Sequence, residues 1–140
     1  MTLLAAEQRV KLVFTLDPAL PDELCGDPQR LSQVLVNLIS NGIKFTDSCG
    51  MVSVHLWMER PDWLLEVADT GIGIPPERLP DIFEPFRRGS DFATRRHQGA
   101  GLGLSIVRSL VELMGGSIKV QSTVGRGTTF SLRFPLEVSA

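Results

Sequence analysis

Two asparagines and a lysine recur along one face of a long segment with a helical apolar pattern, DPQRLSQVLVNLISNGIKFT. With Gln33, the residues Asn37, Asn41 and Lys44 fall within roughly 80° of one another at about 100° per residue of α-helix. Solubility alone would favour Glu, Lys and Arg, because Asn is a poorer helix former. Residues that contradict local preference and share a face often mark a site. The stripe therefore indicates carboxamides and an amine presented to a ligand, with an ordinary polar helix face as the alternative.

A first glycine cluster follows a predicted strand that ends in Asp69. The carboxylate of Asp69 could accept a hydrogen bond from an exocyclic amine such as that of adenine. Gly71 and Gly73 would let the backbone approach such a ligand closely. The alternative is a simple turn after a strand, where Asp and Gly are common.

A second glycine cluster, Gly99, Gly101 and Gly103, opens a predicted helix. Backbone amides at a helix N-terminus form an anion site that suits phosphate. The spacing does not fit a dinucleotide fingerprint, because no strand–helix–strand unit surrounds it. It is not a Walker A loop either, since no Gly-Lys-Ser/Thr follows.

Basic and aromatic residues occupy the long segment between the two glycine clusters. Its arginines could contact phosphates or an acidic partner, although most loop arginines are simply solvated; they are Arg87, Arg88, Arg95 and Arg96. We expect Phe83 and Phe86 to pin this segment to the domain or to a neighbouring one. His55 lies in an alternating strand without an acid in a triad-like position, and His97 lies in a basic loop, so we assign them no catalytic role.

The bulk composition is that of one soluble globular domain. The chain has 140 residues, of which 43% are apolar and 21% charged, and its net charge is -2. This charge argues against nucleic-acid binding, which requires a basic face. Two cysteines are too few for a disulfide framework. No apolar run has the length of a membrane span and no signal peptide is apparent, so we expect a cytoplasmic domain without direct membrane contact.

The elements that position these residues follow from periodicity and breakers. We expect residues 1–9 to be a tail or linker remnant and residues 10–140 to be one domain. The pattern predicts strands at 10–16, 51–58, 63–68, 117–122 and 128–136, helices at 27–46 and 102–114, and a short helix near 77–82. The hairpins require antiparallel pairs, which excludes a purely parallel sheet. The prediction is an α+β fold of two layers, with a mixed sheet of about five strands covered on one face by helices.

Several separated motifs together resemble the catalytic ATP-binding domain of sensor histidine kinases, in the superfamily of gyrase, Hsp90 and MutL. The asparagine box resembles QVLVNLISNGIKFT, the first glycine box DTGIGI, the phenylalanine box IFEPFRR and the second glycine box GAGLGLSIV. A further glycine motif resembles GRGTTF. Each motif alone is weak, but their common order is highly specific. The resemblance implies the Bergerat fold of this superfamily, with an ATP lid formed by the long segment.

The resemblance also assigns roles to single residues of the helix. Asn41 matches the asparagine that ligates the Mg²⁺ bridging the ATP phosphates, and Asn37 lines the same site one turn earlier. Lys44 matches the lysine that reaches the phosphates. Phe45 takes the place of an aromatic residue packed near the nucleotide. Gly42 stands where Ala is commoner, a change expected to loosen the helix without touching the ligands.

Further roles fall on the loops and the last strand. Asp69 matches the aspartate that reads the adenine amine, and Gly73 lets the base approach the backbone. Thr128 matches a hydroxyl that helps to hold the base through water, and Arg88 a lid arginine near the γ-phosphate. By the same resemblance the nucleotide site also includes Gly71, Ile74, Gly99, Gly101, Leu102 and Gly103.

The resemblance implies a kinase that binds ATP and Mg²⁺ and donates the γ-phosphate to a histidine. That histidine would lie on a helical-hairpin phosphoacceptor domain of the same or a dimeric partner chain, with a response regulator downstream. Neither His55 nor His97 has the sequence context of the acceptor, so the chain resembles the catalytic part of a parent that could be membrane-anchored. The alternatives are a pseudokinase-like docking module, and an ATPase or serine kinase of another branch. Asn37 disfavours hydrolysis, because the ATPases carry a water-activating Glu at that position.

Overall fold

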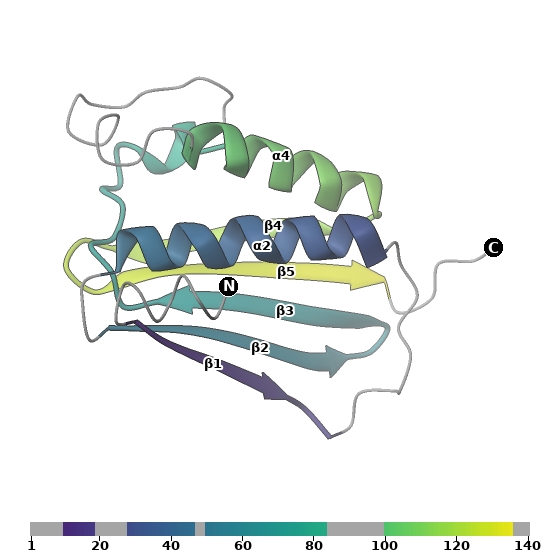
Figure 1. The fold of residues 1–140 in the computed structure, drawn as a ribbon. Coiled ribbons are helices and arrows are strands. Elements are labelled where there is room, and N and C mark those ends of the chain that lie inside the picture. Colours follow the sequence, from purple (N-terminus) through teal and green to yellow (C-terminus); the bar gives the residue numbers. More distant parts are fainter. Residues whose placement is uncertain (1–9, 19–27, 47–49, 84–99, 136–140) are drawn as a thin grey trace.

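In the part of the chain that the structure describes, the fold has two layers, a five-stranded sheet and two helices that cover one of its faces (Figure 1). The computed structural model describes residues 10–18, 28–46, 50–83 and 100–135. Within these residues the strand order is β1-β2-β3-β5-β4. The strands are β1 (Lys11–Leu16), β2 (Met51–Glu59), β3 (Asp62–Asp69), β4 (Ser117–Thr123) and β5 (Gly127–Pro135). The helices are α2 (Pro28–Phe45) and α4 (Ala100–Leu113).

The sheet is mixed, as predicted. Strand β1 runs parallel to β2, and the connection between them contains helix α2. The other three neighbouring pairs, β2–β3, β3–β5 and β4–β5, are antiparallel. The predicted α+β fold is therefore confirmed, and the predicted element bounds differ from the observed ones by only one or two residues. The short helix is narrower than expected, a single 3₁₀ turn η1 (Leu79–Asp81).

The core lies between the helices and the covered face of the sheet. Helix α2 packs over β2 and β3, and α4 packs beside it over β4. The apolar stripe of α2 is confirmed, since Val34, Leu38 and Ile39 are buried and Leu31 and Leu35 pack against them. Alternation in the strands supplies the opposing layer, which consists of Val52, Val54, Trp63, Leu65, Val67, Phe130, Leu132 and Phe134.

Both helices end in local hydrogen bonds that satisfy their last carbonyls. At the end of α2 the hydroxyl of Thr46 donates to the carbonyl oxygen of Gly42 at 2.6 Å. After α4, Gly115 adopts a φ of 77°, and the N–H groups of Gly115 and Gly116 donate to Glu112 and Val111. This is the Schellman arrangement, whose left-handed residue is most easily a glycine. The predicted end of this helix at residue 114 thus lies one residue beyond the observed end at Leu113.

Candidate functional site

The covered face of the sheet becomes polar at one end of three neighbouring strands. Along β3 the buried residues Trp63, Leu65 and Val67 are followed by Asp69 on the same face. The apolar row of β5 ends in Thr128 at this end of the sheet. The apolar row of β4 ends there in Ser122. The register pairs Asp69 with Thr128 and Thr128 with Ser122. We call these three residues the polar row. Because partners in register share a face, their side chains line one end of the helix-covered layer.

Asp69 is the most strongly perturbed acid among the described residues. Burial raises its pKa from 3.8 to about 6, because the ionised carboxylate is partly removed from water. Two backbone hydrogen bonds, from the N–H groups of Gly71 and Thr128, oppose this effect by stabilising the charge. The Gly71 amide donates to Oδ1 at 2.8 Å. A partly buried carboxylate of this kind is well suited to accept a hydrogen bond from a ligand that excludes water.

Helix α2 brings its asparagine stripe to the same end of the sheet. Along the stripe Gln33 is exposed, Asn37 is half-buried and Asn41 is only 5% exposed. The side-chain Nδ2 of Asn41 is buried and has no hydrogen-bond partner. An unsatisfied buried amide is costly, and such groups in native structures often have a functional reason. The orphaned amide fits a residue whose partner is a ligand.

Gly42 seats α2 directly on the sheet beside this end. A Cβ at Gly42 would lie 3.2 Å from a γ-carbon of Val52 and 3.6 Å from the Cβ of Asp69. The glycine therefore allows the helix to approach β2 and β3 closely next to Asp69. The expectation that Gly42 affects only the helix missed this contact.

The first glycine cluster is packed between the end of α2 and the β4–β5 hairpin. The N–H of Ile72 donates to the carbonyl oxygen of Phe45 at 3.1 Å, and a Cβ on Gly71 would overlap the same oxygen. Gly73 has a φ of 77°, and a Cβ there would overlap the backbone of Thr123. These two glycines are thus required by close backbone packing within the protein. The loop begins immediately beside Asp69, so its backbone is fixed relative to the polar row.

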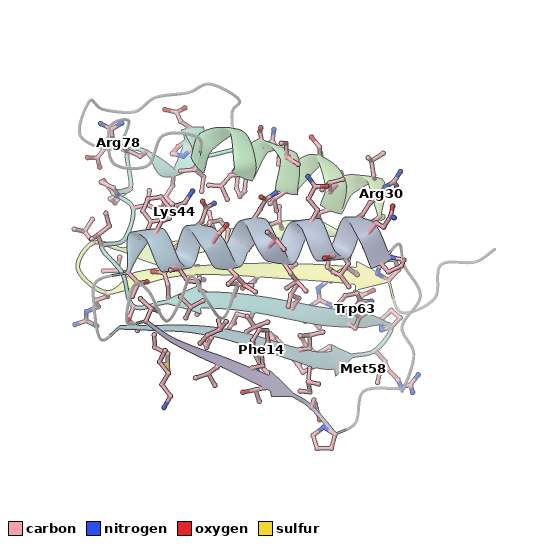
Figure 2. All side chains as sticks on the ribbon, in the orientation of Figure 1. Phe14, Arg30, Lys44, Met58, Trp63 and Arg78 are labelled. Carbon is pink, nitrogen blue, oxygen red and sulfur yellow. The ribbon has the colours of Figure 1, made fainter. Side chains whose placement is uncertain are left out.

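Two cationic side chains lie at this end of the molecule. Figure 2 places Lys44 near the end of α2 on the side of α4, and Arg78 at the same end, opposite Arg30 and Trp63. Lys44 is exposed and Arg78 is half-buried. An exposed lysine beside a largely buried acceptor site is suited to contact the phosphates of a bound nucleotide.

Phe83 anchors the beginning of the long segment to the domain. Its ring packs edge-on against Phe130 with centroids 6.2 Å apart, and the guanidinium of Arg108 lies 5.6 Å from its centroid. The anchoring expected of Phe83 is confirmed. Gly101, Leu102 and Gly103 lie in the first turn of α4, as expected. The remaining predicted residues lie outside the described residues: Phe86, Arg87, Arg88, Arg95, Arg96, His97 and Gly99.

The structure adds two site residues that the sequence reasoning missed. Ser122 is joined to Thr128, and Gly127 lies against Asp69 so closely that a Cβ would overlap the Asp69 carbonyl oxygen. A signal for Ser122 existed, because Ile118 and Val120 alternate inward along the same strand and place Ser122 on the core face. The GRGTTF motif included Gly127 but did not indicate its contact with Asp69.

The donor set for a metal is limited within the described ranges. They contain no group of three or more His, Cys, Asp or Glu residues able to hold an ion together. A divalent cation at Asn41 would therefore need most of its ligands from a bound phosphate and from water, as is usual for Mg²⁺. Among these residues no helix combines the length and apolar character needed to cross a membrane.

Comparison with known proteins shows the family to which the chain is similar. Residues 26–138 match the family described as Histidine kinase-, DNA gyrase B-, and HSP90-like ATPase. The chain is 43% identical over 114 residues to the circadian input-output histidine kinase CikA of Synechococcus elongatus, covering 81% of this chain and 15% of CikA. It is 41% identical over 133 residues to the sensor histidine kinase RcsC of Salmonella typhimurium, covering 95% of this chain and 14% of RcsC.

A solved structure has a similar fold. Full-length ShkA in complex with AMPPNP superposes with a TM-score of 0.84 at 33% identity, over 100% of this chain and 28% of that one. The chain therefore spans only a small part of the length of these relatives.

Proposed function

The chain belongs to the family of histidine kinase-, DNA gyrase B- and HSP90-like ATPases, and we propose that it binds ATP with Mg²⁺ and donates the γ-phosphoryl group to a histidine. The observation that carries this proposal is the pairing of Asp69 with Thr128 at the end of the covered sheet face where α2 packs through Gly42, next to the buried and unpartnered side-chain amide of Asn41. The ATP analogue in the ShkA structure supports a nucleotide as the ligand.

The base would bind at the polar row. The ionised Asp69 carboxylate can only accept hydrogen bonds, so it selects a ligand edge that donates one. The exocyclic amine of adenine is such a donor. Gly71, Gly73 and Ile74 would form the adjoining wall, with Phe45 beside them. Because Asp69 and Thr128 are partners in register, one amine can reach both, directly or through a water.

The phosphates would extend toward the ends of α2 and α4. Lys44 would contact them with its ammonium group, and the backbone amides around Gly101, Leu102 and Gly103, in the first turn of α4, would form the positive end of its dipole beside them. We extend the phosphate site to Gly99 and Arg88 by family resemblance alone. Asn41 and Asn37 would hold Mg²⁺ through amide oxygens, which are hard ligands suited to it. Bound there, Mg²⁺ would neutralise charge on the phosphates during transfer.

Transfer is a better proposal than hydrolysis. Phosphoryl transfer requires positioning and charge neutralisation more than a protein nucleophile. Hydrolysis in addition requires a base that activates water, and the amide of Asn37 cannot serve as one at neutral pH. The acceptor would be a histidine on a helical-hairpin domain of the same or a partner chain, with a response regulator receiving the phosphoryl group afterwards. By analogy with sensor kinases we place this reaction in the cytoplasm.

Calorimetric titration of the chain with ATP in the presence of Mg²⁺ tests the binding step. We expect saturable binding to one site. Absence of binding at about millimolar ATP, where even weak sites of about -4 kcal/mol become half-occupied, would refute the proposal. A control titration after removal of Mg²⁺ with a chelator is expected to show weaker binding.

A further inference from the structure

Ser122 is the member of the polar row to which neither motif nor resemblance gave a role. It lies on β4 beside Thr128 of β5, on the covered face of the sheet. It is part-buried, and three polar atoms surround its hydroxyl oxygen. The N–H of Ile74 donates to Ser122 Oγ at 2.7 Å. The carbonyl oxygen of Gly127 lies at 2.9 Å and Oγ1 of Thr128 at 2.8 Å.

The number of protons determines the direction of these hydrogen bonds. A serine hydroxyl has one proton to donate and two lone pairs that accept. The Gly127 carbonyl can only accept, so the Ser122 proton must be directed to it if that contact is a hydrogen bond. The Ile74 amide takes one lone pair of Ser122. The second lone pair of Ser122 then remains for Thr128. All three contacts are therefore hydrogen bonds only if the Thr128 hydroxyl donates its own proton to that lone pair.

This arrangement fixes the chemical character of Thr128. Once its proton is directed to Ser122, the hydroxyl oxygen of Thr128 can offer a ligand only lone pairs. Its partner in register, Asp69, is likewise an acceptor when ionised. The polar row then presents two acceptors side by side and no donor. The 6-amino group of a purine can donate hydrogen bonds directly to these acceptors, whereas the 6-oxo group of hypoxanthine or guanine would face two acceptors.

We infer that Ser122 is a positioning residue that holds the Thr128 hydroxyl as an acceptor and thereby sets the preference for a 6-amino purine. This inference rests on the proposed function, because it assigns a base preference to the proposed nucleotide site. Ser122 acts through Thr128 and does not itself contact the base.

The same hydroxyl also joins the first glycine loop to the hairpin. The Ile74 bond lies next to a second connection, in which the N–H of Gly125 donates to the carbonyl oxygen of Ile72 at 2.9 Å. The two bonds hold the loop that follows Asp69 against the β4–β5 hairpin. The Ser122 hydroxyl therefore holds this loop in place and also accepts the proton of Thr128.

The test compares the affinities of the chain for ATP and for inosine triphosphate, which carries a 6-oxo group in place of the amine. The two nucleotides share the same triphosphate, so the ratio of their dissociation constants isolates the base. We expect Ser122→Ala to lower the preference for ATP about three- to tenfold, the range of one neutral hydrogen bond. Ser122→Thr, which keeps the hydroxyl, is expected to retain the parental preference. Ser117→Ala, at an exposed position of the same strand, serves as the matched control.

A double-mutant cycle tests whether Ser122 acts through Thr128. Thr128→Val removes the hydroxyl, and in that background we expect Ser122→Ala to leave the ratio unchanged. If Ser122→Ala melts too low to titrate, the near-isosteric Ser122→Cys replaces it, with a smaller loss in the same direction because a thiol is a weaker donor and acceptor than a hydroxyl. An unchanged ratio of the dissociation constants for ATP and inosine triphosphate in Ser122→Ala, or in the variant that replaces it, would overturn the inference. Binding of ATP in the same experiment would still uphold the proposed function. Failure of the parent to bind either nucleotide would refute both.

Discussion

Asp69 and Thr128 face each other across β3 and β5, and the backbone N–H of Thr128 donates to the Asp69 carboxylate. The strand register thus places an acid and a hydroxyl at the same end of the covered face. The acid is held in a partly desolvated position by two backbone donors, and the hydroxyl is held by its neighbour Ser122. This pair defines the proposed base site and leads to the following predictions.

Replacing Asp69 with asparagine is expected to reduce adenine selectivity. An amide side chain can both donate and accept, so it no longer discriminates between a 6-amino and a 6-oxo group. We expect Asp69→Asn to lower the preference for ATP over inosine triphosphate by about tenfold or more, the range for a hydrogen bond to a charged group. Competition titrations measure both affinities. A parental ratio in the variant would show that Asp69 does not read the base.

Folding stability is expected to report the desolvation of Asp69. Between pH 3.8 and about 6 the folded chain binds more protons at this residue than the unfolded chain does. Raising the pH through this window therefore lowers the free energy of unfolding. Across this window we expect the free energy of unfolding of the parent to fall by up to about 3 kcal/mol relative to that of Asp69→Asn. Above the window the difference between the two proteins is expected to stay constant. Urea denaturation at a series of pH values tests this, and a pH-independent difference would contradict it.

A charge at position 41 is expected to make nucleotide binding dependent on metal. Asn41→Asp places a carboxylate at a site that is 5% exposed, close to the proposed phosphates. Without Mg²⁺ we expect ATP affinity to fall by about tenfold or more, because an unpaired buried charge repels the phosphates. Added Mg²⁺ should restore part of the loss. Calorimetry with and without a chelator measures the effect.

Gln33→Glu is the matched control for this substitution. It introduces the same charge at an exposed position of the same helix and is expected to have little effect. Equal behaviour of the two variants would remove Asn41 from the proposed metal site.

Two glycines of one hairpin are expected to differ sharply in tolerance. Gly125 and Gly127 both have positive φ, 84° and 121°. A Cβ at Gly125 would meet nothing within 4 Å, whereas one at Gly127 would overlap the backbone of Asp69. We expect Gly125→Ala to destabilise the fold by about 1 kcal/mol from backbone strain alone, and Gly127→Ala by more than about 3 kcal/mol. Thermal or urea unfolding measures the loss of stability in each variant. Equal losses in the two variants would contradict the close packing of Gly127 against Asp69.

Periodicity was sufficient to predict most of the fold and part of the site. The 3.6-residue pattern of α2 separates Val34 and Leu38 from Asn37 and Asn41, and two-residue alternation carries the inward row of β3 to Asp69. These signals are local, so the sequence displays them directly. They do not determine which strands pair. The sequence predicted a mixed sheet but did not identify β1 and β2 as its parallel pair.

The remaining site features depend on contacts between distant residues. The bond from Ile74 to Ser122 joins positions 48 residues apart. It exists only because β4 pairs with β5 and β5 with β3. The approach of Gly42 to Asp69 likewise depends on how α2 rests on the sheet. A single serine in an alternating strand, or a glycine in a helix, has no local signature of such a contact.

Phosphoryl transfer tests the central claim most directly. The chain would be mixed with a helical-hairpin phosphoacceptor domain of a sensor histidine kinase, ATP labelled at the γ-phosphate and Mg²⁺. We predict label on a histidine of the hairpin, with an acid-labile and base-stable linkage, and a large reduction with Asp69→Asn at subsaturating ATP. A hairpin that binds the chain but stays unlabelled while ATP is bound would contradict the account and indicate a docking module.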